Sequence, residues 1–463
     1  MPSESRPRLR VVIVGAGVSG LIMAHALHKA GIDYIVVEKY ASVVFPTGNV
    51  MTLWPGSQRI LYQLGLLERL QGISTRAVRS VVNQDREGRL LSTISTSALL
   101  LKHGANMVMT ERATLIKLLY EALPDKSKIL TGRPVVGVRH EAGRVHVSFP
   151  DGLSETGDLV IGADGVNSVV RSAMSVFRAW KHIWCLSPRD PRLDFALSSF
   201  GDCRCSIMTL QPETVGFGLL WRIGSDEMRR KARYTADDAD ELVASVASLP
   251  VHEDVVIDDL WKTRIRGSAG DVEVSCHKGW HHGRIVLVGD AAHRVTLLTG
   301  LGGNLCMESA AVLANALHEA VIVAAEKGGN ESRLSESDLE TALTRYQKRQ
   351  LPRALNTCRI ANFVERLQAR DGLWMSFAGR YLSPWLLPVV SSWLMSEWIR
   401  GSPVLDFLSL AGWPLGSTRW AHGEERGKEG GGAGGRLGMG WGGGGDAVMK
   451  FWVGVPTSVV SML

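Results

Sequence analysis

The chain has 463 residues, of which 45% are hydrophobic and 21% charged, the balance of an ordinary globular protein. The formal net charge is +6, and the basic residues are spread along the chain, which argues against nucleic acid as a partner. Residues 1–10 contain no apolar stretch, which argues against a conventional signal peptide and for a protein that is not secreted.

The N-terminal stretch up to Glu38 has the pattern of one βαβ unit. Residues 9–14 form an almost continuous apolar run, which predicts a central parallel strand covered on both faces. The sequence GAGVSG follows at once, and apolar residues then recur at helical spacing until Gly31. A second apolar run, residues 34–37, leads directly to Glu38.

This context gives weight to Gly15-x-Gly17-x-x-Gly20, which is a weak motif by itself. Gly15 permits a tight turn, Gly17 lets the backbone approach a pyrophosphate, and Gly20 lets helix and strand pack closely. The helix N-terminus offers N–H groups to the anion, and Glu38 can accept hydrogen bonds from ribose hydroxyls. An acid there repels a 2′-phosphate, which argues against NADP in this pocket. The motif therefore predicts a dinucleotide site and leaves FAD and NAD open.

The remaining chain alternates between core strands, hairpins and helices. Alternating residues 143–149 and the turn that follows predict antiparallel hairpins, and β-like material runs from about residue 178 to 260. Further core strands are predicted at 158–163 and 283–288, and helices at 112–123, 305–325 and 339–367.

Two of these strands lead into glycine–aspartate corners. Asp164-Gly165 follows the strand at 158–163, and Gly289-Asp290 follows the strand at 283–288 and leads toward a helix. With the first motif, these stretches resemble class A flavin-dependent monooxygenases of the para-hydroxybenzoate hydroxylase-like group, and more closely fungal enzymes of the paxilline-epoxidase type. Residues 8–410 share the resemblance, and its further marks are Glu111-Arg112, Trp280–Gly283 and Val404–Leu408.

The resemblance implies an α/β fold and a role for each matching residue. Glu38 would bind the adenosine ribose, Arg112 the phosphate–ribose region, and Asp290 the ribityl chain of FAD. Asp164 would support a turn used for both FAD and reduced nicotinamide. The other residues implied to lie against the cofactor are glycines: Gly15, Gly17, Gly20, Gly48, Gly302 and Gly303.

The resemblance also implies a domain organisation, with a discontinuous Rossmann-like FAD-binding domain, a β-rich substrate domain and a C-terminal helical region. The expected segments are 8–79 (first βαβ unit), 80–177 (FAD-binding with inserted hairpins), 178–280 (substrate domain), 281–345 (FAD-binding), 346–420 (helical region) and 421–463 (glycine-rich tail). Thirteen of the 23 residues 423–445 are glycine, too few side chains to form a core, which predicts a disordered tail.

The implied activity is that of an FAD-dependent monooxygenase. NADPH or NADH would reduce the flavin, O2 would add at its C4a carbon, and the hydroperoxide would epoxidise or hydroxylate a hydrophobic secondary metabolite. No second GxGxxG occurs between Gly20 and the glycine-rich tail, which fits a nicotinamide that visits the flavin without a Rossmann domain of its own. Two alternatives stay open: a flavin reductase or dehydrogenase of the same fold, and a degenerate flavin-binding protein without catalysis.

Departures from the family's pattern motivate the last alternative. Where the family usually has T-P-x-x-G-Q-G, this chain has Leu297 and Leu301 in place of the proline and glutamine. Lys181 occupies a position where the family often has a basic residue near the substrate, and it is the candidate catalytic residue. Four aromatic residues could line the substrate pocket or belong to a core: Phe195, Phe200, Phe217 and Trp221.

Two features bear on location. Residues 381–396 carry no charge, and eight of the 14 tryptophans lie at or after Trp374, so either a membrane contact or an apolar hairpin packed on the FAD-binding domain is open. The six cysteines show neither a paired framework nor metal-ligand spacing. We therefore expect reduced thiols, no bound metal, and a protein that is cytoplasmic or membrane-associated.

Overall fold

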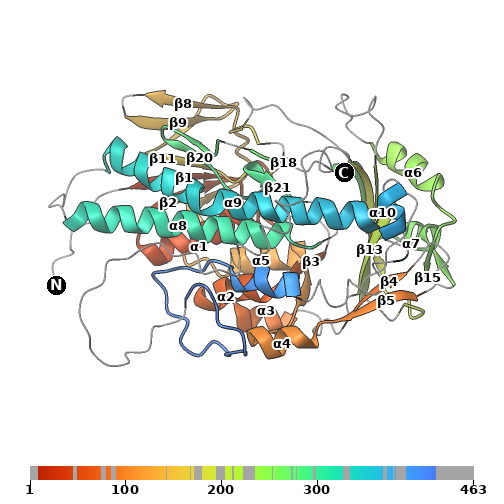
Figure 1. Cartoon of the computed structure of the whole chain (residues 1–463). Coiled ribbons are helices and arrows are strands. Elements are labelled where there is room, and N and C mark those ends of the chain that lie inside the picture. The colour runs from red at the N-terminus through yellow and green to blue at the C-terminus, as the bar shows by residue number, and fades with distance from the viewer. Residues whose placement is uncertain are drawn as a thin grey trace. The chain divides into compact units, whose positions relative to one another are not determined.

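The centre of the fold is a six-stranded sheet in the order β19-β20-β11-β1-β2-β7 (Figure 1). The computed structural model describes residues 9–44, 50–73, 80–84, 90–141, 143–166, 168–171, 180–193, 204–210, 213–222, 235–252, 254–272, 275–277, 279–295, 299–326, 334–368, 373–378, 381 and 393–423. The strands are β1 (Arg10–Val14), β2 (Asp33–Val37), β7 (Ile129–Leu130), β11 (Leu159–Gly162), β19 (His281–His282) and β20 (Ile285–Leu287). All neighbours pair in parallel except β19, which is antiparallel to β20.

Strand β1 shows why the sheet is covered on both faces. Successive side chains of a strand point to opposite faces, so an unbroken apolar run needs two apolar partners. Val11 and Ile13 join the main core with the helices, whereas Val12 and Val14 join a second core. The second core includes an antiparallel sheet made of β8 (Gly137–Glu141), β9 (Arg144–Ser148) and β10 (Ser154–Gly157). The predicted central strand and hairpins are confirmed.

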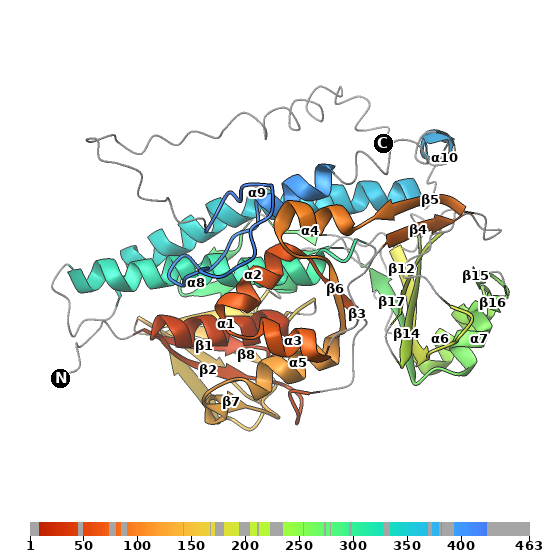
Figure 2. The same ribbon diagram turned by 90° about the horizontal axis from the view of Figure 1, so that it is seen from below.

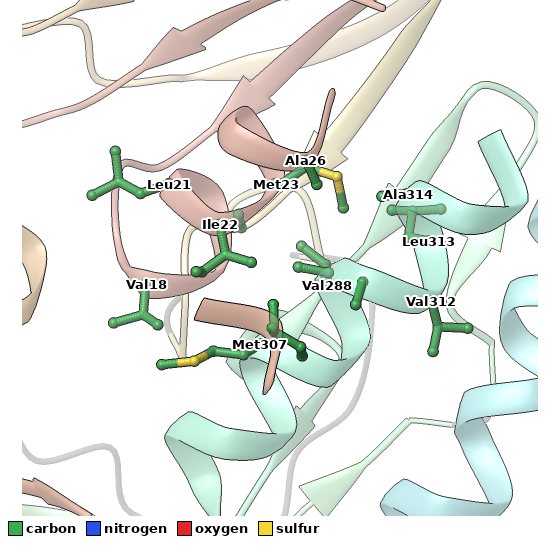
Figure 3. Close-up of a cluster of buried hydrophobic side chains, with 14 of the residues drawn as sticks. Val18, Leu21, Ile22, Met23, Ala26, Val288, Met307, Val312, Leu313 and Ala314 are labelled. Atoms are coloured by element: carbon green, nitrogen blue, oxygen red, sulfur yellow. The ribbon is translucent and has the colours of Figure 1, made fainter. Parts of the chain in front are cut away.

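Helices cover the other face of the central sheet. The helix α1 (Val18–Ala30) lies against α8 (Gly302–Glu326), which in turn lies against α9 (Glu336–Gln368), as Figure 2 shows. Figure 3 shows side chains of α1, such as Ile22, and of α8, such as Met307, meeting around Val288. The predicted helices are present, and α8 begins three residues before its predicted start.

A separate four-stranded antiparallel sheet has the order β13-β14-β12-β17. Its strands are β12 (Trp180–Pro188), β13 (Arg204–Leu210), β14 (Thr214–Arg222) and β17 (Arg266–Val272). It packs with α6 (Ala236–Ala244) and α7 (Ile257–Lys262) around a core of its own. Phe217 is 1% exposed in that core, so at this position the core reading of the four aromatic residues is correct. Phe195, Phe200 and the side chain of Trp221 lie outside the described residues.

The smaller elements complete the described part. The helices are α2 (Pro55–Gln63), α3 (Leu67–Ile73), α4 (Ser97–His103), α5 (Arg112–Glu121), α10 (Leu373–Phe377) and the short helices η1 (Lys126–Lys128) and η2 (Gly289–Ala291). The strand pairs are β3 (Val50–Leu53) with β6 (Val108–Glu111), β4 (Ser80–Gln84) with β5 (Leu90–Ser95), β15 (Pro250–His252) with β16 (Val255–Val256), and β18 (Ser275–Cys276) with β21 (His293–Arg294). All of these elements belong to one compact unit, residues 1–424, so the predicted domain boundaries stay a prediction.

Membrane-spanning potential is confined, among the described residues, to α8, the one helix there that is long and apolar enough. Most of its apolar stretch is buried in the protein interior, as in the core helix of a globular fold. Of the uncharged segment 381–396, the structure describes residue 381 and residues 393–396. The glycine-rich stretch predicted to be disordered lies outside the described residues, apart from Gly423.

Two buried glutamates on the paired helices differ in their partners. Glu308 on α8 is fully buried and receives two hydrogen bonds from Arg353 on α9, of 2.6 and 2.8 Å. Glu365 is equally buried on α9, on the same face as Ala361, and within the described structure neither of its oxygens has a hydrogen-bond partner. Burial raises the pKa of Glu365 from 4.5 to about 8, so its carboxyl group is protonated at neutral pH.

The raised pKa of Glu365 predicts a pH-dependent stability. Between pH 4.5 and about pH 8 the unfolded chain releases this proton and the folded chain keeps it. The group's stabilising contribution is therefore fully present below pH 4.5 and decreases by about 1.4 kcal/mol per pH unit as the pH rises toward 8. In urea unfolding from pH 5 to 8, Glu365→Gln should remove that slope. An identical slope in the variant would contradict the assignment.

Candidate functional site

The turn between β1 and α1 has no space for a side chain at Gly15 or Gly20. Gly15 has φ +102°, and a Cβ there would lie 2.6 Å from the carbonyl oxygen of Ala163. A Cβ on Gly20 would lie 1.9 Å from the carbonyl oxygen of Gly15. Both distances are far below van der Waals contact, so only glycine lets the turn, the helix and the end of β11 approach this closely.

The N-terminus of α1 can receive an anion. Gly17 is the N-cap, it provides no capping side chain, and the first turn of the helix holds no acidic residue. The backbone N–H groups there therefore carry the positive end of the helix dipole. Arg112, the first residue of α5, places its Nη2 3.5 Å from where a Cβ on Gly17 would be. Arg112 therefore lies beside the glycine turn, and its predicted contact with the phosphate–ribose region of FAD stays a prediction.

Glu38 follows β2 and is 8% exposed. Its Oε2 accepts a hydrogen bond of 2.7 Å from the Ala16 N–H, and its Oε1 accepts one of 3.0 Å from the Tyr40 N–H. These bonds fix the carboxylate at the mouth of the glycine turn. A carboxylate has about four acceptor positions. Glu38 can therefore hold the turn and still accept hydrogen bonds from ribose hydroxyls.

The second corner begins where β11 ends. The Oδ2 of Asp164 accepts hydrogen bonds from the N–H groups of Val169 (2.7 Å) and Val170 (3.3 Å), which closes the turn. Its Oδ1 is buried and has no hydrogen-bond partner in the described structure. A buried acceptor without a partner is costly, which is the condition that a bound hydroxyl or N–H group relieves. The second corner touches the first, because a Cβ on Gly15 would lie 3.0 Å from the Cα of Asp164.

The third corner, Gly289-Asp290, packs against α1. Gly289 has φ +63°, and a Cβ there would lie 2.0 Å from the Oγ of Ser19. The thiol of Cys306 on α8 lies 3.4 Å from Asp290 Oδ1. Burial, with the charge of Asp290 as a second cause, raises the pKa of Cys306, so the thiol stays protonated and donates to the carboxylate. The third corner is thereby held at the N-terminal half of α1.

Arg171 joins the second corner to the third, and the sequence reasoning did not single it out. Its buried guanidinium donates from Nη1 to the carbonyl oxygens of Asp290 (3.2 Å) and Ala291 (2.9 Å), and from Nη2 to that of Val166. The available signal was an arginine closing the second glycine–aspartate stretch. A buried cation needs several acceptors, but their positions follow from the fold and not from spacing along the chain.

The start of α8 approaches β3 closely. A Cβ on Gly303 would lie 2.1 Å from Met51 Cε, whereas Gly302 has only ordinary contacts with Val295. Asn304, another residue missed from the sequence, is fully buried and donates to the carbonyl oxygens of Thr52 and Gly300, each at 2.7 Å. Its Oδ1 accepts from the Trp54 N–H at 2.9 Å. These three bonds fasten the loop before α8 to β3.

Of the two leucines that depart from the family's pattern in that loop, the structure describes only Leu301. Leu301 is fully buried in the main core, so apolar packing anchors the loop where the family usually has a glutamine. Leu297 lies outside the described residues, as does Gly48. Lys181 lies on β12, opposite Trp221 of β14 and Asp271 of β17, and its side chain is outside the described part.

His293 follows the third corner, and its environment is that of a packing residue rather than a catalytic base. The ring is 1% exposed, with Nε2 hydrogen-bonded to the hydroxyl of Ser309 at 2.5 Å. Burial lowers its pKa to about 3, so it remains neutral and has a packing role. No group of three or more metal-ligating side chains occurs among the described residues.

Comparison with known proteins identifies the family. Residues 8–332 match the FAD binding domain family. The FAD-dependent monooxygenase ausM of Penicillium brasilianum is 31% identical over 410 residues, which are 84% of this chain and 85% of that protein. The chain belongs to the class A FAD-dependent monooxygenases. The chain is also 29% identical to the FAD-dependent monooxygenase penE of Penicillium thymicola over 439 residues, which are 88% of this chain and 90% of penE.

Solved structures show the same fold. HpxO of Klebsiella pneumoniae, solved with FAD and uric acid, has a TM-score of 0.70 at 21% identity and covers 84% of this chain and 96% of its own. FqzB has a TM-score of 0.64 at 21% identity, covering 86% of this chain and 96% of its own. The monooxygenase thus has the FAD-binding fold with mixed α/β content that its sequence predicted.

The contact between Gly289 and Ser19 yields a test of the third corner. Gly289→Ala should reduce the free energy of unfolding by at least about 2 kcal/mol, because the left-handed backbone is strained and the methyl group meets Ser19. The matched control is Gly132→Ala, which has φ +67° and no atom within 4 Å of the added Cβ. It should cost about 1 kcal/mol. Equal losses in thermal unfolding would refute the close packing.

Proposed function

We propose that the three corners hold a single FAD. The observation that carries the proposal is that each corner touches the other two, through Gly15 and Asp164, through Arg171, and through Gly289 and Ser19. The residues fit the cofactor by their chemistry: an uncapped helix start, a carboxylate with spare acceptor positions, and a buried oxygen that has no partner among the described residues. Convergence of three such groups is what one long dinucleotide requires.

Each residue then has a part of the cofactor to hold. The N–H groups at Gly17 and the guanidinium of Arg112 would neutralise the phosphates. Glu38 would accept hydrogen bonds from the adenosine ribose, and Asp290 from the ribityl chain. The backbone at Gly302 and Gly303 would face the flavin ring, where the positive end of the α8 dipole favours negative charge on the reduced ring. Gly48, which follows β2 in the sequence, would also lie against the cofactor.

When bound, the flavin supplies the redox chemistry, reduction by NADH or NADPH and activation of O2. The residues of the chain orient the reactants and exclude water. Glu38 disfavours a 2′-phosphate at the dinucleotide site, so NADPH would have to approach the flavin from elsewhere. The absence of a second GxGxxG between Gly20 and the glycine-rich tail supports a nicotinamide that visits the flavin without its own Rossmann domain.

We assign substrate binding to the region between the four-stranded sheet and the flavin, with residues 178–280 as the substrate domain. Residues 8–177 and 281–345 would form the discontinuous FAD-binding domain, and residues 346–420 the helical region. Glu111 supports this arrangement: its carboxylate accepts from the Thr214 hydroxyl and pairs with Arg266, each at 3.1 Å. Its neighbour Arg112 faces the glycine turn, so one dipeptide joins the substrate sheet to the cofactor site.

The proposed substrate is a hydrophobic, prenylated or polyketide-derived secondary metabolite, which would be epoxidised or hydroxylated. Its support is the similarity to fungal FAD-dependent monooxygenases over most of the chain. Lys181 on β12, in the central part of the proposed substrate sheet, is the candidate for a polar contact with the substrate or the flavin.

The experiment that tests this function is reduction and reoxidation of the purified protein. It should be yellow, lose its colour with NADPH under nitrogen during prolonged incubation, and regain it in air with one O2 consumed per NADPH. Colour loss without reoxidation by O2 would favour a dehydrogenase. A yellow protein that no nicotinamide bleaches would favour a flavin-binding protein without catalysis, and a colourless protein that takes up no added FAD would end the proposal.

We also propose that the protein is intracellular and contacts a membrane surface through the region around residues 381–396. Aromatic side chains there are exposed and in mutual contact: Trp374 stacks on Phe377, which contacts Tyr381, and Trp393 is 47% exposed. Such rings favour the headgroup region of a bilayer.

Sedimentation with vesicles tests the membrane contact. The vesicles consist of phosphatidylcholine with one-fifth phosphatidylserine. The amount of wild-type protein that sediments with them should be about tenfold larger than that of a Trp374→Ser/Phe377→Ser variant, because exposed aromatic area drives the binding. Leu415→Ser is the control, since Leu415 is 82% exposed and lies in another segment. Equal sedimentation of the wild-type protein and both variants would contradict the proposed membrane contact.

A further inference from the structure

Two cysteines that show no pairing signal in the sequence lie beside the third corner. Cys276 lies on β18, and Cys358 lies on α9, which contacts β18. The strand pair β18–β21 places Cys276 opposite His293. The thiol of Cys358 lies 3.7 Å from the carbonyl oxygen of Arg294, the residue after His293. Both residues therefore lie beside the same two-residue strand, β21. The Cys358 thiol is also the main cause of a lowered pKa at the Cys276 thiol.

The two thiols are chemically unequal. Cys276 is partly exposed, and the hydrogen bond from Cys358 lowers its pKa. Cys358 is 7% exposed, and its hydrogen bond to Cys276, together with burial, raises its pKa well above the usual value. Thiolate, not thiol, is the form that reacts with oxidants. The pair thus combines a partly exposed thiol whose pKa is lowered with a buried thiol whose pKa is raised.

The other described thiols lack this arrangement. Cys185 is 1% exposed, burial raises its pKa to about 11, and the hydroxyl of Ser187 lies 3.8 Å from its sulfur. Cys306 is 6% exposed and contacts Asp290. Neither forms a thiol–thiol contact within the described residues, so both serve as internal references for reactivity.

We propose that Cys276 and Cys358 form a peroxide-sensitive modification site that closes into a disulfide between β18 and α9. The thiolate of Cys276 attacks hydrogen peroxide, so an S–O bond forms, the O–O bond breaks and hydroxide leaves. The sulfur of Cys358 then attacks the resulting sulfenic acid, which forms the S–S bond and releases water. In sum, two thiols lose two electrons and two protons, and one hydrogen peroxide becomes two waters.

The disulfide would form next to the segment that joins the Asp290 corner to the start of α8. β21 directly follows the Asp290 corner, and Arg294 leads into the loop that ends at Gly302. A covalent link would fix the spacing between α9 and this strand, which non-covalent contacts hold in the reduced protein, among them the one between Cys358 and Arg294. An enzyme that reduces O2 without transferring oxygen to a substrate releases hydrogen peroxide. A flavin held by the three corners would release it close to this cysteine pair. External peroxide would serve equally, so the inference does not rest on the proposed substrate.

Peptide mapping of the FAD-loaded, full-length protein tests the inference. The protein is treated with one equivalent of hydrogen peroxide, denatured in N-ethylmaleimide, digested and analysed by mass spectrometry. The expected result is a cross-linked peptide joining Cys276 to Cys358, formed at least about tenfold faster than any oxidation of Cys185 or Cys306. Dithiothreitol should restore both thiols. Oxidation of all four at equal rates, or a link to another chain, would overturn the proposal.

Two serine variants separate the roles of the pair. In Cys358→Ser, Cys276 should accumulate as sulfenic acid and be trapped by dimedone, because the resolving thiol is gone. In Cys276→Ser, Cys358 should react no faster than Cys185. Equal dimedone labelling of Cys358 and Cys276 in the two variants would contradict the assigned order. Mapping of the wild-type protein decides the main claim even if a variant folds poorly.

Discussion

The structure depends on the close approach of backbone at three glycines. Gly15, Gly20 and Gly289 each lie where a Cβ would come within 2.6 Å of another atom. Because side chains are excluded there, the end of β1, the start of α1, the end of β11 and the third corner meet in one small region. The polar groups around that region are Glu38 and the Asp164 oxygen that has no partner in the described part of the chain. They gain their proposed roles only because this packing brings them together.

Electrostatic arrangement separates the groups that hold the fold from those available to a ligand. Arg171 donates hydrogen bonds to carbonyl oxygens of the second and third corners, and Arg353 pairs with the buried Glu308. The helix start at Gly17 and the second acceptor positions of Glu38 remain for the cofactor. Glu365 differs from all of these, because burial leaves it protonated and without a partner among the described residues.

The sequence predicted the parts of the fold that local pattern controls. Continuous apolar runs indicated β1 and β11, and glycine spacing indicated the first turn, because these features depend on neighbouring residues. Contacts between distant segments were not predictable in this way. Arg171, Asn304 and the Cys276–Cys358 contact each depend on the tertiary arrangement, since their partners lie on other strands and helices. Lys181 stays a prediction because its side chain lies outside the described residues.

Hydrogen–deuterium exchange during titration of FAD into the flavin-free protein tests the central claim most directly. If the three corners form one site, residues 15–20, 164–171 and 289–304 should gain protection together and reach half of their change at the same FAD concentration. Protection confined to one of the three segments, or clearly different midpoints among them, would contradict a single site built from all three.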